Sequence, residues 1–138
     1  MPSGKRPPHA FSLAGEVRDY ECDLQGIVNN AVYQNYLEHA RHVFLKQSGI
    51  VFSDLAKSGT HLVIVRAELD YKAPLRSGDA FEIGLSIRKL SPVRIEFTQD
   101  IFLLPSRKLL LASRFECAAM DASGRPIFPR VLDRLFAV

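Results

Sequence analysis

Asp23 is the residue whose type and position point most directly to chemistry. It stands seven residues before Asn30, where a helix is expected to begin, and Gly26 lies between them. An acid in this place often only caps a turn or favours the positive end of the helix dipole. Alternatively, its carboxylate attacks an acyl carbon or activates water, while unpaired N–H groups at the helix start bind the oxygen that becomes negative. That pairing suffices to hydrolyse a thioester, because a thiolate leaves without a strong general acid.

Histidine and cysteine side chains offer weaker alternatives. His39 and His42 are three residues apart, a spacing that can bind a metal, but two histidines without a third ligand nearby rarely form a metal site. We therefore expect no metal and no cofactor. Cys22 adjoins Asp23, yet no histidine lies close in sequence to activate it, so a small buried side chain is expected rather than a nucleophile.

Charged residues near the expected turn at Leu90 are candidates for binding the carrier of an acyl group. Arg88, Lys89 and Arg94 flank this turn and can contact the phosphates of coenzyme A or an acidic carrier protein. The alternative is that they only keep a surface turn solvated.

One long amphipathic helix is expected directly after the Asp23 loop. Asn29 or Asn30 is a suitable N-cap, and Gly49 stands where a left-handed residue would end the helix. Apolar residues recur at intervals of three and four, and polar residues fall largely on the other side, where Glu38 and Arg41 can pair. The apolar set is Tyr33, Tyr36, Leu37, Ala40, Val43 and Phe44, and the polar set is Gln34, Glu38, Arg41, His42 and Lys46.

Five further segments have the composition of strands. Residues 11–21 alternate loosely between apolar and polar, and residues 61–71, 80–90, 94–104 and 109–120 are rich in β-branched and aromatic types. Turns containing Pro or Gly separate them, and residues 52–57 are expected to form a short turn. Five strands and one long helix indicate an α+β domain whose antiparallel sheet wraps round the helix. Because one sheet layer leaves a face open, we expect a dimer.

Composition is that of an ordinary globular protein. The 138 residues, 47% hydrophobic and 24% charged, suit a single domain, expected at 11–138 after a short polar leader at 1–10. A formal charge of +3 spread along the chain does not favour nucleic acid as a partner. No apolar run reaches the roughly 18 residues of a membrane span. Cys22 and Cys117 form no CxxC pair, so a reducing, cytoplasmic location is expected.

The segment from Tyr20 to Leu45 resembles the 4-hydroxybenzoyl-CoA thioesterase family. Asp23-Leu-Gln-Gly-Ile-Val-Asn-Asn-Ala-Val-Tyr33 nearly repeats the pattern Asp-x-x-Gly-Val-Val-Asn-Asn-Ala-Val-Tyr of plant acyl-lipid and methylketone synthase-type thioesterases. Ala73-Pro-Leu-Arg-Ser-Gly-Asp resembles the family's turn before its third strand, so the likeness covers about 17–129. Bacterial relatives of the tol-pal-associated type carry Tyr-His in place of the Asn pair, and no role of that His is carried over.

This resemblance implies a hotdog fold, in which an antiparallel sheet curls round a central helix and dimers, often assembled into tetramers, hold active sites at their interface. It implies that Asp23 is catalytic, that the backbone N–H of Asn30 polarises the thioester carbonyl, and that Gly26 lets the loop pass close to the substrate. Asn29 and Tyr33 of the same motif are expected to contact the substrate. The oxyanion role survives the change of side chain, because the donor is a backbone group.

The leading hypothesis is hydrolysis of a fatty acyl or β-ketoacyl thioester of acyl carrier protein or coenzyme A, with Asp23 attacking directly or activating water. Within the enzyme class, an aroyl-CoA or polyketide-pathway thioesterase is the alternative. A non-catalytic hotdog module that binds acyl groups is the alternative outside that class. Other hotdog branches use a different acid, so Glu38 is a second candidate, although Asp23 already supplies a carboxylate.

Overall fold

The computed structural model describes residues 9–136 as one sheet covered on one side by helices. The expected leader at 1–10 therefore lies outside the described residues except for its last two. Among the described residues, no helix has the length and apolar character needed to cross a membrane. The elements in chain order are β1 (Phe11–Glu16), η1 (Asp19–Glu21), α1 (Asn30–Gln47), α2 (Phe52–Lys57), β2 (His61–Tyr71), β3 (Ala80–Ser91), β4 (Arg94–Leu103), β5 (Lys108–Met120) and η2 (Arg130–Phe136).

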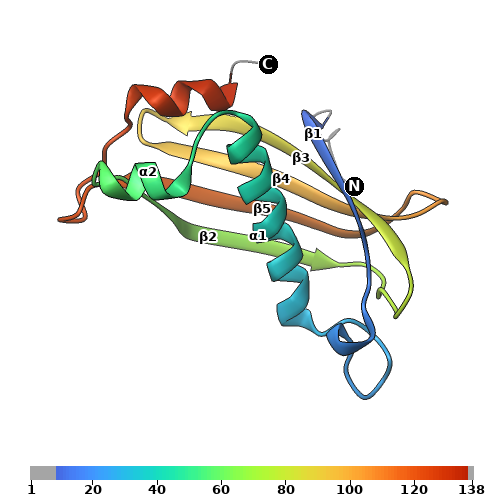
Figure 1. Ribbon diagram of the computed structural model, residues 1–138. Helices are drawn as coiled ribbons and strands as arrows, with labels where there is room; N and C mark the ends of the chain where they lie inside the picture. The colour runs from blue at the N-terminus through green and yellow to red at the C-terminus, as the bar shows by residue number, and fades with distance from the viewer. Residues whose placement is uncertain (1–8, 137–138) are drawn as a thin grey trace.

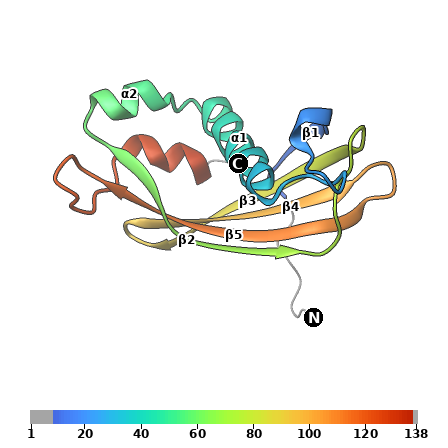
Figure 2. The same ribbon diagram turned by 90° about the horizontal axis from the view of Figure 1, so that it is seen from below.

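All five strands form a single antiparallel sheet in the order β1-β3-β4-β5-β2. Figure 1 shows α1 lying across the strands. In the turned view of Figure 2, the sheet forms one layer, and α1, α2 and η2 form a second layer on one side of it. The predicted α+β architecture, with an antiparallel sheet and one long helix, is confirmed.

The helix α1 begins and ends where the sequence predicts. The Asn29 side chain accepts a hydrogen bond from the Ala31 N–H at 2.9 Å, which makes Asn29 the N-cap. After the helix, Gly49 has a φ of +85°, and a residue with a side chain rarely adopts this left-handed conformation. Leu37 and Ala40 of α1 are fully buried against the sheet, where Phe97 of β4 is 1% exposed. The buried face of α1 therefore forms the centre of the core.

Two predictions about local structure were wrong, and one element was missed. The first strand ends at Glu16 rather than at residue 21, because the facing chain turns just before β3, where the Asp79 N–H donates to Arg76 O, and residues 19–21 form a 3-10 turn. Residues 52–57 form the short helix α2 rather than a turn. The 3-10 helix η2 was not predicted at all, and it buries Leu132 and Leu135. The other strand boundaries differ from the predicted ones by one residue at most.

Candidate active site

Residues 22–28 form a tight hairpin between η1 and α1. Cys22 and Val28 pair across it, and within it the Asp23 N–H donates to Ile27 O at 2.8 Å. The Gly26 N–H donates to Asp23 O at 3.0 Å, and Gly26 has a φ of +79°. Glycine adopts this conformation without strain, so Gly26 permits the sharp turn that carries Asp23.

One oxygen of the Asp23 carboxylate is held by the hairpin and the other is not. Oδ1 accepts from the Gln25 N–H at 2.9 Å and from the Ile27 N–H at 3.4 Å. Oδ2 makes no hydrogen bond within the described part of the chain, and the residue is half-buried. The carboxylate is therefore fixed in direction while one oxygen stays available to an acyl group or a water molecule.

The same turn occurs a second time at Asp121, between β5 and η2. There the Asp121 carboxylate accepts from the N–H groups of Ser123 and Arg125, both at 2.9 Å, and Gly124 has a φ of +85°. The Ser123 hydroxyl, which donates to the same carboxylate at 2.7 Å, contributes most to lowering the pKa of Asp121, and the backbone N–H groups add to it. The turn by itself therefore explains an aspartate at both positions. What distinguishes Asp23 is its place beside the start of α1.

The hairpin brings Asp23 close to the N-terminus of α1. The Asn29 N–H donates to Glu21 O at 3.1 Å, so the chain on either side of the hairpin stays paired up to the helix. Asn30 is the first helical residue, and its N–H makes no hydrogen bond to any residue that the structure describes. Asp23 faces Ile27 across the hairpin, and Asn30 lies three residues beyond Ile27. At the spacing of an extended chain, the Cα atoms of Asp23 and Asn30 are therefore on the order of 10 Å apart. Asp23 and the Asn30 N–H thus lie at the same end of α1.

Two tyrosines of α1 secure the loops around this site. The Val28 N–H donates to Leu75 O at 2.9 Å, and the Leu75 N–H donates to the Tyr33 hydroxyl at 2.8 Å. The Tyr36 hydroxyl donates to the Glu21 carboxylate at 2.7 Å. Burial raises the pKa of both phenols, and for Tyr36 the Glu21 carboxylate adds to this effect. Tyr33, expected to contact the substrate, is 3% exposed and holds the β2–β3 loop from within the core.

Arg88, Lys89 and Arg94 lie far from Asp23 within one chain. They surround the β3–β4 turn, whereas the Asp23 hairpin bridges to Arg76 just before β3 begins. Eight residues of β3 separate Ala80 from Arg88, a distance of roughly 26 Å. Each cation contacts a neighbouring side chain. Arg88 pairs with Glu96 at 2.9 Å, Arg94 pairs with Glu116 at 2.6 Å, and the Lys89 ammonium lies 4.0 Å from the ring centroid of Phe128.

Arg41 contradicts the predicted division of α1 into apolar and polar faces. It was expected on the exposed side beside Glu38, but it is 8% exposed, and among the described residues it forms no ion pair. Its Nη1 donates to Gln99 Oε1 at 2.9 Å, and its guanidinium lies 4.3 Å from the Phe115 ring centroid. Burial lowers the pKa of Arg41. The signal in the sequence is its spacing, four residues after the buried Leu37.

Known proteins that are similar to this chain identify its family. The sequence model of the thioesterase-like superfamily matches residues 17–135. A chloroplastic acyl-acyl carrier protein thioesterase of Arabidopsis thaliana is 42% identical over 127 residues, which cover 92% of this chain and 67% of the relative. A putative acyl-CoA thioesterase of Bacillus subtilis is 38% identical over 119 residues, 86% of each chain. The crystal structure of a 1,4-dihydroxy-2-naphthoyl-CoA thioesterase from Synechocystis superposes with a TM-score of 0.87 at 19% identity, covering 92% of this chain and 95% of that one.

These matches confirm the family and the fold expected from the motif between Asp23 and Tyr33. The chain spans 59% to 67% of the length of the two plant relatives that it matches. The chain belongs to the thioesterase-like superfamily and has the hotdog fold of the thioester hydrolases that it resembles.

Proposed function

We propose that the protein hydrolyses fatty acyl, or β-ketoacyl, thioesters of acyl carrier protein or coenzyme A, with Asp23 as the reacting carboxylate. One observation carries this proposal. Asp23 has a single carboxylate oxygen held by backbone N–H groups, and it sits on the hairpin that leads to the unbonded N–H of Asn30. The plant and Bacillus relatives, described as acyl-acyl carrier protein and putative acyl-CoA thioesterases, support this choice of substrates.

The reaction follows from these two groups. The free oxygen of Asp23 attacks the thioester carbonyl carbon, or it takes a proton from a water molecule that attacks instead. Negative charge develops on the carbonyl oxygen, and the N–H of Asn30 donates to it, an interaction worth about a hundred- to a thousandfold in rate. The thiolate then leaves. After direct attack, water opens the anhydride on Asp23 and regenerates the carboxylate.

We also propose that two chains pair through β2. This strand lies at an edge of the sheet and exposes an apolar run, in which Val63, Ile64 and Val65 are 37%, 43% and 39% exposed. Such an edge presents unpaired N–H and C=O groups beside apolar side chains, which favours pairing with a second strand. Antiparallel pairing of two β2 strands would give one continuous sheet, and the predicted tetramer would be a pair of such dimers.

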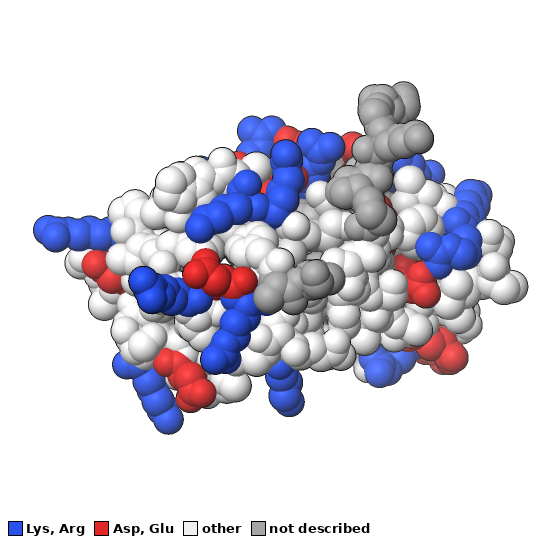
Figure 3. Space-filling model, turned by 90° about the horizontal axis from the view of Figure 1, so that it is seen from above, with Lys and Arg blue, Asp and Glu red and all other residues white. Residues whose placement is uncertain are grey.

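Pairing through β2 gives the β3–β4 turn a role in substrate binding. Antiparallel β2 strands would place the β3–β4 turn of one copy at the same end as the Asp23 hairpin of the other. Exposed ion pairs contribute only about 0–1 kcal/mol, so Arg88 and Arg94 can exchange their glutamate partners for phosphate. Figure 3 shows Lys and Arg spread over one face with Asp and Glu between them, which suits a local phosphate contact better than a long polyanion.

The proposed enzyme is a single domain, residues 11–138, that needs no metal or cofactor and works in the cytoplasm. Asp23 and the Asn30 N–H supply the chemistry without further groups. Both cysteines are free thiols, which suits a reducing compartment.

A panel of thioesters tests the proposal. The wild-type chain and Asp23→Ala would be assayed for thiol release from fatty acyl, β-ketoacyl and aroyl thioesters of coenzyme A and from acyl carrier protein thioesters. We expect turnover to fall by several orders of magnitude in Asp23→Ala. The matched control is Asp121→Ala, which breaks the same kind of turn away from the site and should retain activity. Near-normal activity of Asp23→Ala would exclude the mechanism, and binding of acyl groups without thiol release across the panel would indicate a non-catalytic module.

A further inference from the structure

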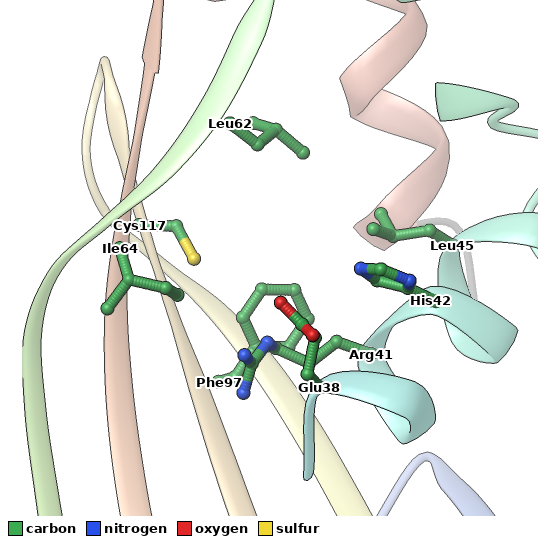
Figure 4. A pocket seen from close by; sticks show the side chains of 8 residues that line it. All are labelled: Glu38, Arg41, His42, Leu45, Leu62, Ile64, Phe97 and Cys117. Atoms are coloured by element: carbon green, nitrogen blue, oxygen red, sulfur yellow. The ribbon is translucent and has the colours of Figure 1, made fainter. Parts of the chain in front are cut away.

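A pocket of about 70 Å³ lies between α1 and the β2 side of the sheet. Figure 4 shows side chains from α1 on one wall and side chains from the strands on the other. The helix wall carries three polar side chains beside Leu45, and the strand wall is apolar apart from the Cys117 thiol. The lining residues are Glu38, Arg41, His42 and Leu45 from the helix, with Leu62, Ile64, Phe97 and Cys117 from the strands.

Arg41 gives this pocket a chemical preference. Its side chain is more than nine-tenths buried, yet its one hydrogen bond in the described part of the chain is the one that Nη1 donates to Gln99. A guanidinium carries five N–H donors, and burying a charged group is unfavourable unless its donors are satisfied. An alkyl chain in the pocket would remove water from these donors and offer no acceptor. A ligand with an oxygen atom at this depth would supply the acceptor.

Glu38 and Cys117, two other polar residues of the lining, indicate which oxygen fits. Glu38 lines the same pocket, so its negative charge disfavours a carboxylate ligand. A hydroxyl group both accepts and donates, so it can accept from Arg41 and donate to Glu38, which a ketone cannot do. The Cys117 thiol adds no charge, because burial raises its pKa to about 11. The pocket is therefore matched to a neutral hydroxyl.

Size and position determine the rest of the ligand. An apolar cavity of about 150 Å³ holds benzene, so this pocket of about 70 Å³ suits a narrow chain better than a ring. Asn30, Gln34 and Glu38 recur every four residues and form one exposed stripe that runs from the helix start to the pocket. Eleven residues of helix separate Asn30 from Arg41, a rise of roughly 16 Å. A chain whose carbonyl meets the Asn30 N–H would thus reach the pocket with its distal part.

We propose that this pocket binds a hydroxyl group on the distal part of an aliphatic acyl chain, and that Arg41 and Glu38 make the enzyme selective for hydroxylated acyl thioesters. The inference rests on the proposed function, because it places the thioester at Asp23 and Asn30. It adds a substrate class and two specificity-determining residues.

The test compares saturated acyl-CoA thioesters with ω-hydroxyacyl-CoA thioesters of equal length, over a series of lengths. At the length that reaches the pocket, we expect kcat/KM to be about ten- to a hundredfold higher for the hydroxylated member, as for a hydrogen bond to a charged group. Arg41→Met should bring this ratio close to one, and Glu38→Gln should lower it several-fold. Arg114→Met is the matched control, because Arg114 is an exposed arginine of β5 adjacent to Phe115, and the ratio should not change.

Each outcome decides the proposal. The proposal is overturned if, in the wild type, kcat/KM for the hydroxylated thioester never exceeds that for the saturated one of equal length. It is also overturned if Arg41→Met leaves this ratio unchanged, because the variant then loses activity equally on both substrates. If Arg41→Met does not fold, the exposed Glu38→Gln variant carries the same comparison. If the wild type hydrolyses no thioester, the proposed function fails separately, and calorimetry with free fatty acids and ω-hydroxy acids still tests the pocket. Tighter binding of the hydroxy acid, with a preference that falls several-fold in Glu38→Gln, supports it, and equal binding of the two acids overturns it.

Discussion

Replacing Gln99 should destabilise the packing of α1 on the sheet, because Gln99 of β4 makes two hydrogen bonds to the helix. The Gln99 side chain is fully buried, its Oε1 accepts from Arg41 Nη1 at 2.9 Å, and its Nε2 donates to Leu37 O at 2.8 Å. Gln99→Leu keeps most of the volume and removes both hydrogen bonds. A lost bond to a charged group costs about 1.5–3 kcal/mol and a lost neutral bond about 1 kcal/mol, so the free energy of unfolding should fall by about 2.5–4 kcal/mol. That is a large part of the roughly 5–15 kcal/mol that stabilises a domain.

Urea unfolding followed by circular dichroism measures this loss, at a fixed protomer concentration because association contributes to stability. The control is Gln47→Leu at the exposed end of α1, which should change the free energy of unfolding by no more than about 0.5 kcal/mol. A loss below about 1 kcal/mol in Gln99→Leu would refute the reasoning, because it would mean that Arg41 is satisfied without this glutamine.

Three further predictions concern the loops, the edge of the sheet and the buried thiol. Tyr33→Phe removes the acceptor for the Leu75 N–H and should lower the free energy of unfolding by about 1–3 kcal/mol in urea titrations, whereas unchanged stability would contradict the role of the phenol. Val63→Lys places a charge on the exposed β2 edge and should shift dimers toward monomers in sedimentation velocity, and an intact dimer would argue against edge pairing. The pKa of Cys117 is raised from its ordinary value of 9.0 to about 11, so the folded chain keeps a proton that the unfolded chain loses. Stability should therefore fall between pH 9 and 11 by at most about 1.4 kcal/mol per pH unit, and Cys117→Ala should remove this part of the pH dependence.

Local signals in the sequence determine most of the fold. β2 has its predicted bounds, and the neighbouring strands end within a residue of the Pro- and Gly-containing turns that separate them. The end of β1 was not predictable in this way, because the loose alternation continues past Glu16. A segment distant in sequence ends that strand, because the facing chain turns just before β3 begins and the Asp79 N–H donates to Arg76 O instead of to β1.

The candidate site was predictable only as far as its motif extends. Asp23, Gly26 and the helix start are adjacent in sequence, so their type and spacing indicate the loop and its chemistry. Arg41 was misplaced, because its main partner, Gln99, lies 58 residues away and becomes a neighbour only when α1 packs on β4. Periodicity assigns a charged residue to the exposed face unless such a partner is known.

The charge on Asp23 is the central claim, and exchanging aspartate for asparagine tests it most directly. Asp23→Asn keeps the side-chain acceptor for the Gln25 N–H, and Asp121→Asn makes the same change in the matching turn. We predict that kcat for thiol release falls at least about a thousandfold in Asp23→Asn and stays within about twofold in Asp121→Asn, with thermal unfolding unchanged in both. An Asp23→Asn enzyme within tenfold of the wild type would show that the aspartate only shapes its turn.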